Sequence, residues 1–225
     1  EHLRRDYGGR GSVTHAVDDV SFSVERGEFV GIMGASGSGK STLLNCIATI
    51  DTPTAGHIRV EGQDVTALKG RSLSRFRRER LGFVFQDCNL LDTLTAFENI
   101  ALALTIRGTP AGEIEGRVKE TAELLGITDC LNKYPYQMSG GQRQRTAAAR
   151  AIITDPALVL ADEPTGALDS RTGKHVLEIL HGLHDDGSTI ILITHDNGIA
   201  ATAERVVRIS DGHIIYDGDR EGAFL

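Results

Sequence analysis

A glycine-rich run that ends in lysine, serine and threonine carries the clearest chemistry in the sequence. It consists of Gly34, Ala35, Ser36, Gly37, Ser38, Gly39, Lys40, Ser41 and Thr42. The run fits G-x-x-x-x-G-K-[ST], the pattern of a loop that surrounds phosphate groups between a strand and a helix. Glycines let the backbone approach a phosphate closely, and free N–H groups at the helix start favour an anion. We expect Lys40 to face the outer phosphates and Ser41 to ligate Mg²⁺.

Two acidic residues follow a second apolar segment. Asp162 and Glu163 come directly after the apolar residues 157–161. Mg²⁺ prefers oxygen ligands, so we expect Asp162 to hold the metal, directly or through water. Glu163 is then the candidate general base for an attacking water. The alternative is an acidic pair on the surface at a strand end.

Polar residues also end two other predicted strands. Gln86 follows residues 81–85, and His195 follows residues 189–194. Ligands in open α/β sheets bind outside the carboxyl ends of the strands. We therefore expect Gly34, Asp162 and His195 to converge on one edge, with Gln86 contacting the metal or the terminal phosphate. Taken singly, each residue could be merely structural.

A second helix start has the features of an anion site. Ser139, Gly140, Gly141 and Gln142 precede an alanine-rich segment. Serine is a favourable N-cap, and the N–H groups of Gly140 and Gly141 would face an anion. The alternative is a helix that is capped and nothing more. Two such helix starts in one chain indicate that a nucleotide is held from two sides.

Hydrophobic patterning predicts the elements that position these residues. Continuous apolar runs at 29–33, 157–161 and 189–194 predict buried strands. Alternation predicts a half-buried antiparallel strand at 20–24 and an exposed strand at 57–62, and Asp211-Gly212 predicts a hairpin turn. The pattern is helical through most of 87–156. We predict one α/β domain over 1–225, with a parallel-sheet core and an antiparallel β layer in 1–86 and 157–225. Residues 87–156 form an inserted helical subdomain.

Residues 69–80 form a basic segment. A membrane-surface or nucleic-acid patch is one interpretation. A solvated helix face is the interpretation we favour.

Composition narrows the class of protein. The net charge of −7 argues against a nucleic-acid partner. The 3 cysteines are far apart, which fits a reducing cytosol rather than a disulfide framework or a zinc site. We see no signal peptide, and the longest apolar run, 100–106, is too short to span a bilayer. The sequence begins at Glu1 without methionine, so we expect a few preceding residues, including an edge strand.

The order of these motifs resembles the ATP-binding subunit of an ABC transporter. The resemblance covers essentially the whole chain and rests on GASGSGKST, Gln86, MSGGQ, LVLADE, GALD and His195. It implies a RecA-like P-loop NTPase core, ATP and Mg²⁺ as cofactors, and ATP hydrolysis. It also implies that two copies pack head to tail, so that each ATP lies between one copy's phosphate loop and the other's SGGQ segment.

The resemblance assigns roles to individual residues. Tyr7 would stack on adenine, and Ser41 and Gln86 would ligate Mg²⁺, with Asp162 supporting the metal. Glu163 would polarise the water, and His195 would contact the γ-phosphate. Ser139 and Gly141 would reach the γ-phosphate of the ATP bound to the partner, and Asp169 would lie at the dimer interface. Met138 replaces the usual leucine and Gly166 a common serine. Neither change removes a catalytic group.

Within the family, residues 89–99 and 161–170 resemble a branch that serves macrolide and antimicrobial-peptide exporters and lipoprotein release. This branch implies an integral-membrane permease as partner and a place on the cytoplasmic face of the membrane. Leu90, Leu91 and Leu94 could form the surface on which the permease docks, or could be ordinary core leucines. The other hypotheses are a non-transport ATPase acting on DNA ends or ribosomes, and a regulatory subunit of a sensing, signalling or cell-division complex.

Overall fold

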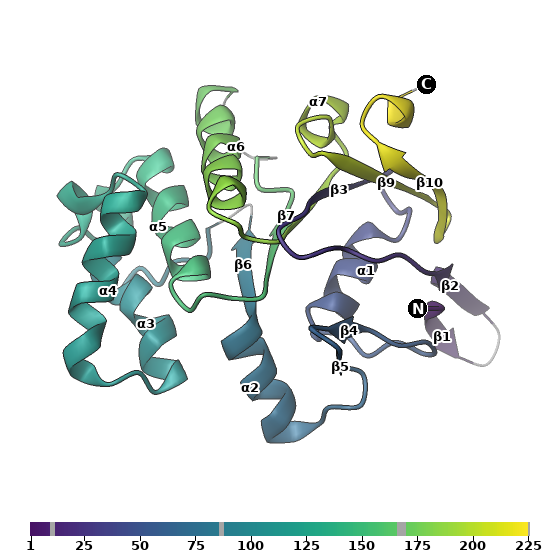
Figure 1. The fold of residues 1–225 in the computed structure, drawn as a ribbon, viewed down its shortest axis with the longest axis horizontal. Helices are drawn as coiled ribbons and strands as arrows, with labels where there is room; N and C mark the ends of the chain where they lie inside the picture. Colours follow the sequence, from purple (N-terminus) through teal and green to yellow (C-terminus); the bar gives the residue numbers. More distant parts are fainter. Residues whose placement is uncertain (10–11, 86–87, 166–169, 225) are drawn as a thin grey trace. The chain divides into compact units, whose positions relative to one another are not determined.

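The computed structural model describes residues 1–9, 12–85, 88–165 and 170–224 (Figure 1). Its contacts divide the chain into two compact units. The first unit is Glu1–Arg77 with Thr189–Leu225, and the second is Arg78–Ser188.

A mostly parallel sheet forms the core of the first unit. Strand β3 (Phe29–Met33) pairs in parallel with β8 (Ile190–Thr194) on one side and with β9 (Arg205–Ser210) on the other. Strand β9 continues through the predicted Asp211-Gly212 turn into the antiparallel β10 (His213–Asp219). Every residue of β3 and β8 is buried. The prediction of strands covered on both faces is therefore confirmed at 29–33 and 190–194.

Short helices and antiparallel strands complete the first unit. The helices are α1 (Lys40–Ile47), α7 (Asn197–Ala200) and the 3₁₀ helix Gly222–Phe224. Two antiparallel strand pairs are formed by β1 (Leu3–Gly9) with β2 (Ser12–Val20) and by β4 (Arg59–Val60) with β5 (Gln63–Asp64). Helix α1 follows β3 through the glycine-rich loop, as the sequence predicts.

The strand predicted at 20–24 is wrong, because β2 ends at Val20. Val20 pairs with Leu3, and beyond this pair the backbone groups bond to side chains instead. The His2 N–H donates to Ser21 Oγ at 2.7 Å, and the Arg205 side chain donates to the Ser23 carbonyl at 2.9 Å. The alternation at 20–24 could not reveal that these groups bond to side chains rather than to a neighbouring strand.

The second unit combines a parallel strand pair with helices. Helix α2 (Gly70–Arg80) begins in the first unit, and its last residues, from Arg78 on, belong to the second. It leads into β6 (Leu81–Phe85), which pairs in parallel with β7 (Leu158–Asp162). The other helices are α3 (Ala96–Arg107), α4 (Ala111–Leu124), α5 (Gly140–Ile152) and α6 (Ser170–Asp185), with 3₁₀ turns at Thr128–Cys130 and Pro135–Gln137. Helices α3, α4 and α5 lie side by side (Figure 1). Their side chains, including Ile100, Leu104, Val118 and Ala149, form one buried apolar cluster.

No helix in the described ranges combines the length and apolar character that crossing a membrane requires.

Candidate nucleotide-binding and catalytic site

The phosphate loop of the first unit is held by close approach of two neighbouring carbonyls. A Cβ on Gly34 would lie 2.2 Å from the carbonyl oxygen of Ile209, and a Cβ on Gly39 would lie 2.1 Å from that of Ala16. Gly39 also has a φ of 105°, in the left-handed region that favours glycine. Any other residue at these positions would displace β9 or β2 from the loop.

Helix α1 starts without a side-chain cap. Gly39 is the N-cap, and the first helical N–H bond runs from Leu43 to the Gly39 carbonyl at 2.8 Å. The N–H groups of Lys40, Ser41 and Thr42 have no backbone acceptor within the described residues. Uncapped N–H groups at a helix start attract anions.

The Lys40 ammonium group lies inside the loop. Its Nζ donates to the carbonyls of Gly34 and Ala35 at 2.7 and 2.8 Å, and the residue is only 6% exposed. An ammonium group has three donors, so one donor remains for a phosphate. Nearby, Ser38 Oγ is buried and has no hydrogen-bond partner among the described residues. These groups fit a bound phosphate.

Asp162 and Glu163 lie at the end of β7 in the second unit. Leu158, Val159, Leu160 and Ala161 are buried, whereas Asp162 and Glu163 are half-buried. Glu163 has a φ of 44° and precedes Pro164, where an extended backbone is usual. Left-handed backbone at a non-glycine residue costs about 1–3 kcal/mol and is concentrated at functional sites.

His195 follows β8 directly and is exposed. The adjacent chain is fixed locally, because Asp196 caps α7 by accepting from the N–H groups of Gly198 and Ile199 at 2.7 and 3.1 Å. The chain therefore turns sharply from the end of β8 into α7, and the His195 imidazole lies at this turn.

The sequence-predicted metal ligands are only partly described. Ser41 is exposed at the start of α1, and Asp162 is half-buried at the end of β7. Gln86 lies outside the described residues, as do Asp169 and Gly166. No group of three or more His, Cys, Asp or Glu side chains capable of holding a metal occurs among the described residues. A hydroxyl and one carboxylate suit Mg²⁺, which takes its other ligands from phosphate and water.

Helix α5 starts with a complete capping box. Ser139 Oγ accepts from the Gln142 N–H at 3.2 Å, and Gln142 Oε1 accepts from the Ser139 N–H at 3.1 Å. This confirms Ser139 as the N-cap. The N–H groups of Gly140 and Gly141 have no backbone acceptor in the described ranges. Gln142 Nε2 also donates to the Asp129 carboxylate at 3.2 Å, which places a negative group beside this helix start.

The far end of α5 holds the chain that follows Gln86. Arg150 donates to the carbonyls of Cys88 and Asn89 at 2.8 and 2.7 Å. Both residues are left-handed, with φ of 58° and 46°. Burial lowers the pKa of the Arg150 guanidinium. Sequence reasoning missed this arginine, because nothing in its neighbours along the chain indicates a partner 62 residues away.

Tyr7 lies on β1 opposite Thr14 and is 39% exposed. Its hydroxyl donates to Asp51 Oδ2 at 2.5 Å, and the Arg5 guanidinium lies 4.5 Å from its ring centre. Sequence reasoning singled out Tyr7 but missed Arg5 and Asp51. The two-residue spacing of Arg5 and Tyr7 on a strand was an available signal, because such residues share a face.

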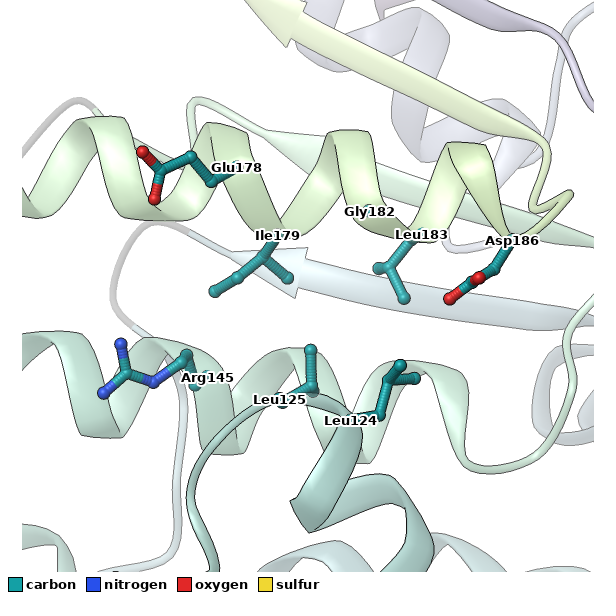
Figure 2. Close-up of a pocket in the computed structure, with 8 residues that line it drawn as sticks. All are labelled: Leu124, Leu125, Arg145, Glu178, Ile179, Gly182, Leu183 and Asp186. Carbon is teal, nitrogen blue, oxygen red and sulfur yellow. The ribbon is translucent and has the colours of Figure 1, made fainter.

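A cavity of about 220 Å³ lies within the second unit. Leu124, Leu125, Ile179 and Leu183 form its apolar middle, with Arg145 and Glu178 toward one end and Asp186 at the other (Figure 2). None of the described site residues predicted from the sequence lines it.

A glycine-rich phosphate loop between a buried parallel strand and a helix, with carboxylates ending another buried strand, defines a P-loop nucleoside triphosphatase. Residues 17–166 match the ABC transporter family. The chain belongs to this family, as an ATP-binding subunit of an ABC transporter that hydrolyses ATP.

Relatives with curated names include the ABC transporter ATP-binding protein YxdL of Bacillus subtilis. It is 48% identical to this chain over 228 residues, which cover 100% of the chain and 88% of YxdL. The macrolide export ATP-binding/permease protein MacB of Aggregatibacter actinomycetemcomitans is 48% identical over 217 residues. That match covers 96% of the chain but only 34% of MacB, so the chain spans about a third of that relative.

Solved structures confirm the fold class predicted from the sequence, an α/β P-loop fold with a mostly parallel sheet. The dimeric post-hydrolysis state of the ATP-binding cassette MJ0796 with ADP and Pi has a TM-score of 0.86 and 37% identity, covering 98% of this chain and 97% of that one. The transporter component cbiO1 of Clostridium perfringens has a TM-score of 0.88 and 28% identity, covering 100% of this chain and 88% of that one.

Proposed function

We propose that this ATPase works as a head-to-tail pair of identical chains that powers a separate integral-membrane permease. The observation that carries the proposal is that the chain has two unlike helix starts with open N–H groups, one at Lys40 and one at Gly140. A single nucleotide held between two copies would use the first start of one copy and the second start of the other. The dimeric form of the MJ0796 cassette supports this arrangement.

In the proposed site, the residues of one copy bind the triphosphate and prepare the water. Lys40 and the open N–H groups of α1 hold the phosphates, and Tyr7 stacks on the base. Ser41, Gln86 and Asp162 hold Mg²⁺, which neutralises charge on the phosphates when bound. Glu163 orients and polarises the water, and His195 contacts the terminal phosphate.

The second copy completes the site in this proposal. The Ser139 hydroxyl accepts from the Gln142 N–H but keeps its own proton to donate. Together with the N–H groups of Gly140 and Gly141 it reaches the terminal phosphate of the partner's ATP, and Asp169 lies at the seam.

The permease partner is supported by the names of relatives, which combine ATP binding with a permease. We propose that the chain lies on the cytoplasmic face of the membrane through this partner. It would serve macrolide or antimicrobial-peptide export, or lipoprotein release. Leu91, 47% exposed beside the chain held by Arg150, is the leucine best placed for docking, whereas Leu90 packs against the helical core.

Dilution of the purified chain tests the pairing. We expect ATP hydrolysis to rise faster than linearly with chain concentration, because only pairs complete the site. Activity strictly proportional to concentration, from a chain shown to be monomeric by light scattering, contradicts the proposed pair.

The Glu163→Gln variant tests the chemistry. General-base catalysis contributes about 10²- to 10⁴-fold, so we expect hydrolysis to fall by about that factor while ATP affinity is retained. ATP should then hold the pair together, which light scattering can follow. The control is Glu123→Gln, at an exposed glutamate of α4. Near-normal turnover by Glu163→Gln would refute the role of Glu163.

A further inference from the structure

Arg5, Tyr7 and Asp51 form one bonded cluster in the first unit. Asp51 accepts from Arg5 Nε at 2.9 Å and lies 2.7 Å from Arg5 Nη2, a two-pronged ion pair. The same carboxylate accepts from the Tyr7 hydroxyl at 2.5 Å and from the Thr52 N–H at 2.8 Å. The Arg5 guanidinium also lies over the Tyr7 ring, 4.5 Å from its centre. The ring is therefore fixed both at its hydroxyl and on one face.

The backbone that carries this cluster is itself fixed. Arg5 and Tyr7 are two apart on β1, so their side chains share a face. Asp51 follows the end of α1, where its N–H donates to the Asn45 carbonyl at 3.0 Å. The chain just beyond it joins β1, because the Thr54 N–H donates to the Arg4 carbonyl at 2.7 Å. Asp51 is thus attached both to the phosphate-binding helix and to the strand of Tyr7.

The strand pair that carries the cluster also contacts the phosphate loop at the other end of α1. The Ala16 carbonyl of β2 packs against Gly39, before the first turn of α1. Tyr7 of β1, the strand paired with β2, bonds to Asp51 beyond the last turn of α1. The β1–β2 pair therefore contacts both ends of the segment that begins at the phosphate site.

We infer that Arg5 and Asp51 are positioning residues that hold the Tyr7 ring as a preformed wall for the nucleobase. This inference rests on the proposed role of Tyr7. With Arg5 on one face, the opposite face of the ring receives the base, giving the order guanidinium, tyrosine ring, base. Preorganisation raises affinity, because the ring does not lose rotational freedom when the nucleotide binds.

The charge state of the cluster agrees with this arrangement. Burial by itself raises the pKa of Asp51. The hydrogen bonds from Tyr7, Thr52 and Arg5 outweigh burial and leave the pKa below its usual value. Hydrogen bonding to Tyr7 and Asp51 raises the pKa of Arg5. The carboxylate and guanidinium both stay charged at neutral pH.

The test compares two probes, ATP and inorganic tripolyphosphate, which has no base. Their affinities are measured by calorimetry on the chain carrying Arg5→Ala, Asp51→Asn or Tyr7→Phe. We expect ATP affinity to fall by about 3- to 10-fold in each, the range expected for losing a hydrogen bond or a cation–π contact. Tripolyphosphate affinity should stay unchanged. Arg5→Lys should fall between wild type and Arg5→Ala, because lysine lacks the planar fork.

A neighbouring pair on the same strand provides the matched control. Arg4 Nε lies 3.2 Å from the Asp6 carboxylate, and the other described partners of the Arg4 side chain are Asp18 and His15. Arg4→Ala and Asp6→Asn should destabilise the strand pair to a similar extent and leave the ATP-to-tripolyphosphate ratio unchanged. Thermal unfolding of all variants measures that loss of stability.

The outcomes distinguish the positioning role of Arg5 and Asp51 from the proposed stacking role of Tyr7. If Tyr7→Ala changes the ratio but Arg5→Ala and Asp51→Asn do not, the positioning inference is wrong and the stacking role stands. If both probes weaken together in these two variants, the cluster is only structural. If Tyr7→Ala leaves the ratio unchanged, the stacking role itself fails. Tyr7→Phe keeps the ring and the fold, so the experiment is decisive even if Arg5→Ala unfolds.

Discussion

The two helix starts of this protein are built from similar residues but present different chemistry. At α1 the N-cap is a left-handed glycine without a side-chain cap, and a buried ammonium group lies in the loop before it. At α5 the N-cap is a serine in a closed capping box, with the carboxylate of Asp129 beside it. The Arg143 guanidinium also lies at this start, where it donates to the Met138 carbonyl at 3.1 Å.

The difference indicates which helix N-terminus can bind an anion without groups from a second copy. The α1 start offers three open N–H groups and a positive charge, which together favour a triphosphate. The α5 start has already used one N–H group for its own cap and lies beside both the Asp129 carboxylate and the Arg143 guanidinium. It is suited to contact a phosphate that another copy has already bound and partly neutralised.

Between the two helix starts, the largest effect should come from removing the charge at α1. Lys40→Ala should weaken ATP binding about 10- to 150-fold, because a hydrogen bond to a charged group contributes about 1.5–3 kcal/mol. Calorimetry on the dilute chain measures this. Lys69→Ala, at an exposed lysine of the same unit, is the control. Unchanged affinity in Lys40→Ala would remove the distinction between the two helix starts.

Removing the cap at α5 should leave ATP binding intact but reduce turnover. Ser139→Ala should bind ATP as tightly as wild type when dilute and hydrolyse it at least about 10-fold more slowly, consistent with losing a charge-assisted contact. The chain should also lose about 1 kcal/mol of unfolding free energy with its N-cap.

Helix α3 provides a matched control for that variant, because Thr95 and Glu98 form the same capping box. Thr95→Ala should cost a similar unfolding free energy, measured by urea titration, without slowing hydrolysis. Equal loss of hydrolysis in both variants would mean that the Ser139 effect is one of stability alone.

The smallest effect concerns the acidic neighbour of α5. Asp129→Asn removes a negative charge next to the helix start, and such charges near helix ends contribute about 0.3–1 kcal/mol at low ionic strength. We expect the concentration of chain needed for half-maximal hydrolysis to fall by about 2- to 5-fold at low salt and to be unchanged at high salt. If this concentration rose at low salt in Asp129→Asn, Asp129 would favour pairing of the two copies instead of opposing it.

The sequence predicts those elements and turns that depend on residues close together in the chain. The buried strands β3, β7 and β8, the phosphate loop, the cap at Ser139 and the hairpin at Asp211 each rest on residues that are close in the chain. The carboxylate pairing of Tyr7 could not be predicted in this way, because Asp51 is 44 residues away.

The same limit applies to backbone conformation. The left-handed Glu163 precedes a proline, for which local rules predict an extended backbone. The left-handed Cys88 and Asn89 depend on Arg150 of α5. The contacts of Arg150 with Cys88 and Asn89 are tertiary contacts, which hydrophobic periodicity does not encode.

The cluster around Tyr7 also makes the protein its own optical reporter. The chain contains 4 tyrosines and no tryptophan, so its intrinsic ultraviolet emission comes from tyrosine alone. One of the four is bonded to a carboxylate and stacked on a guanidinium, while Tyr134 and Tyr136 stack on each other in the second unit. A base arriving on Tyr7 should therefore alter emission that Tyr7→Phe leaves constant, so nucleotide binding can be followed without a label.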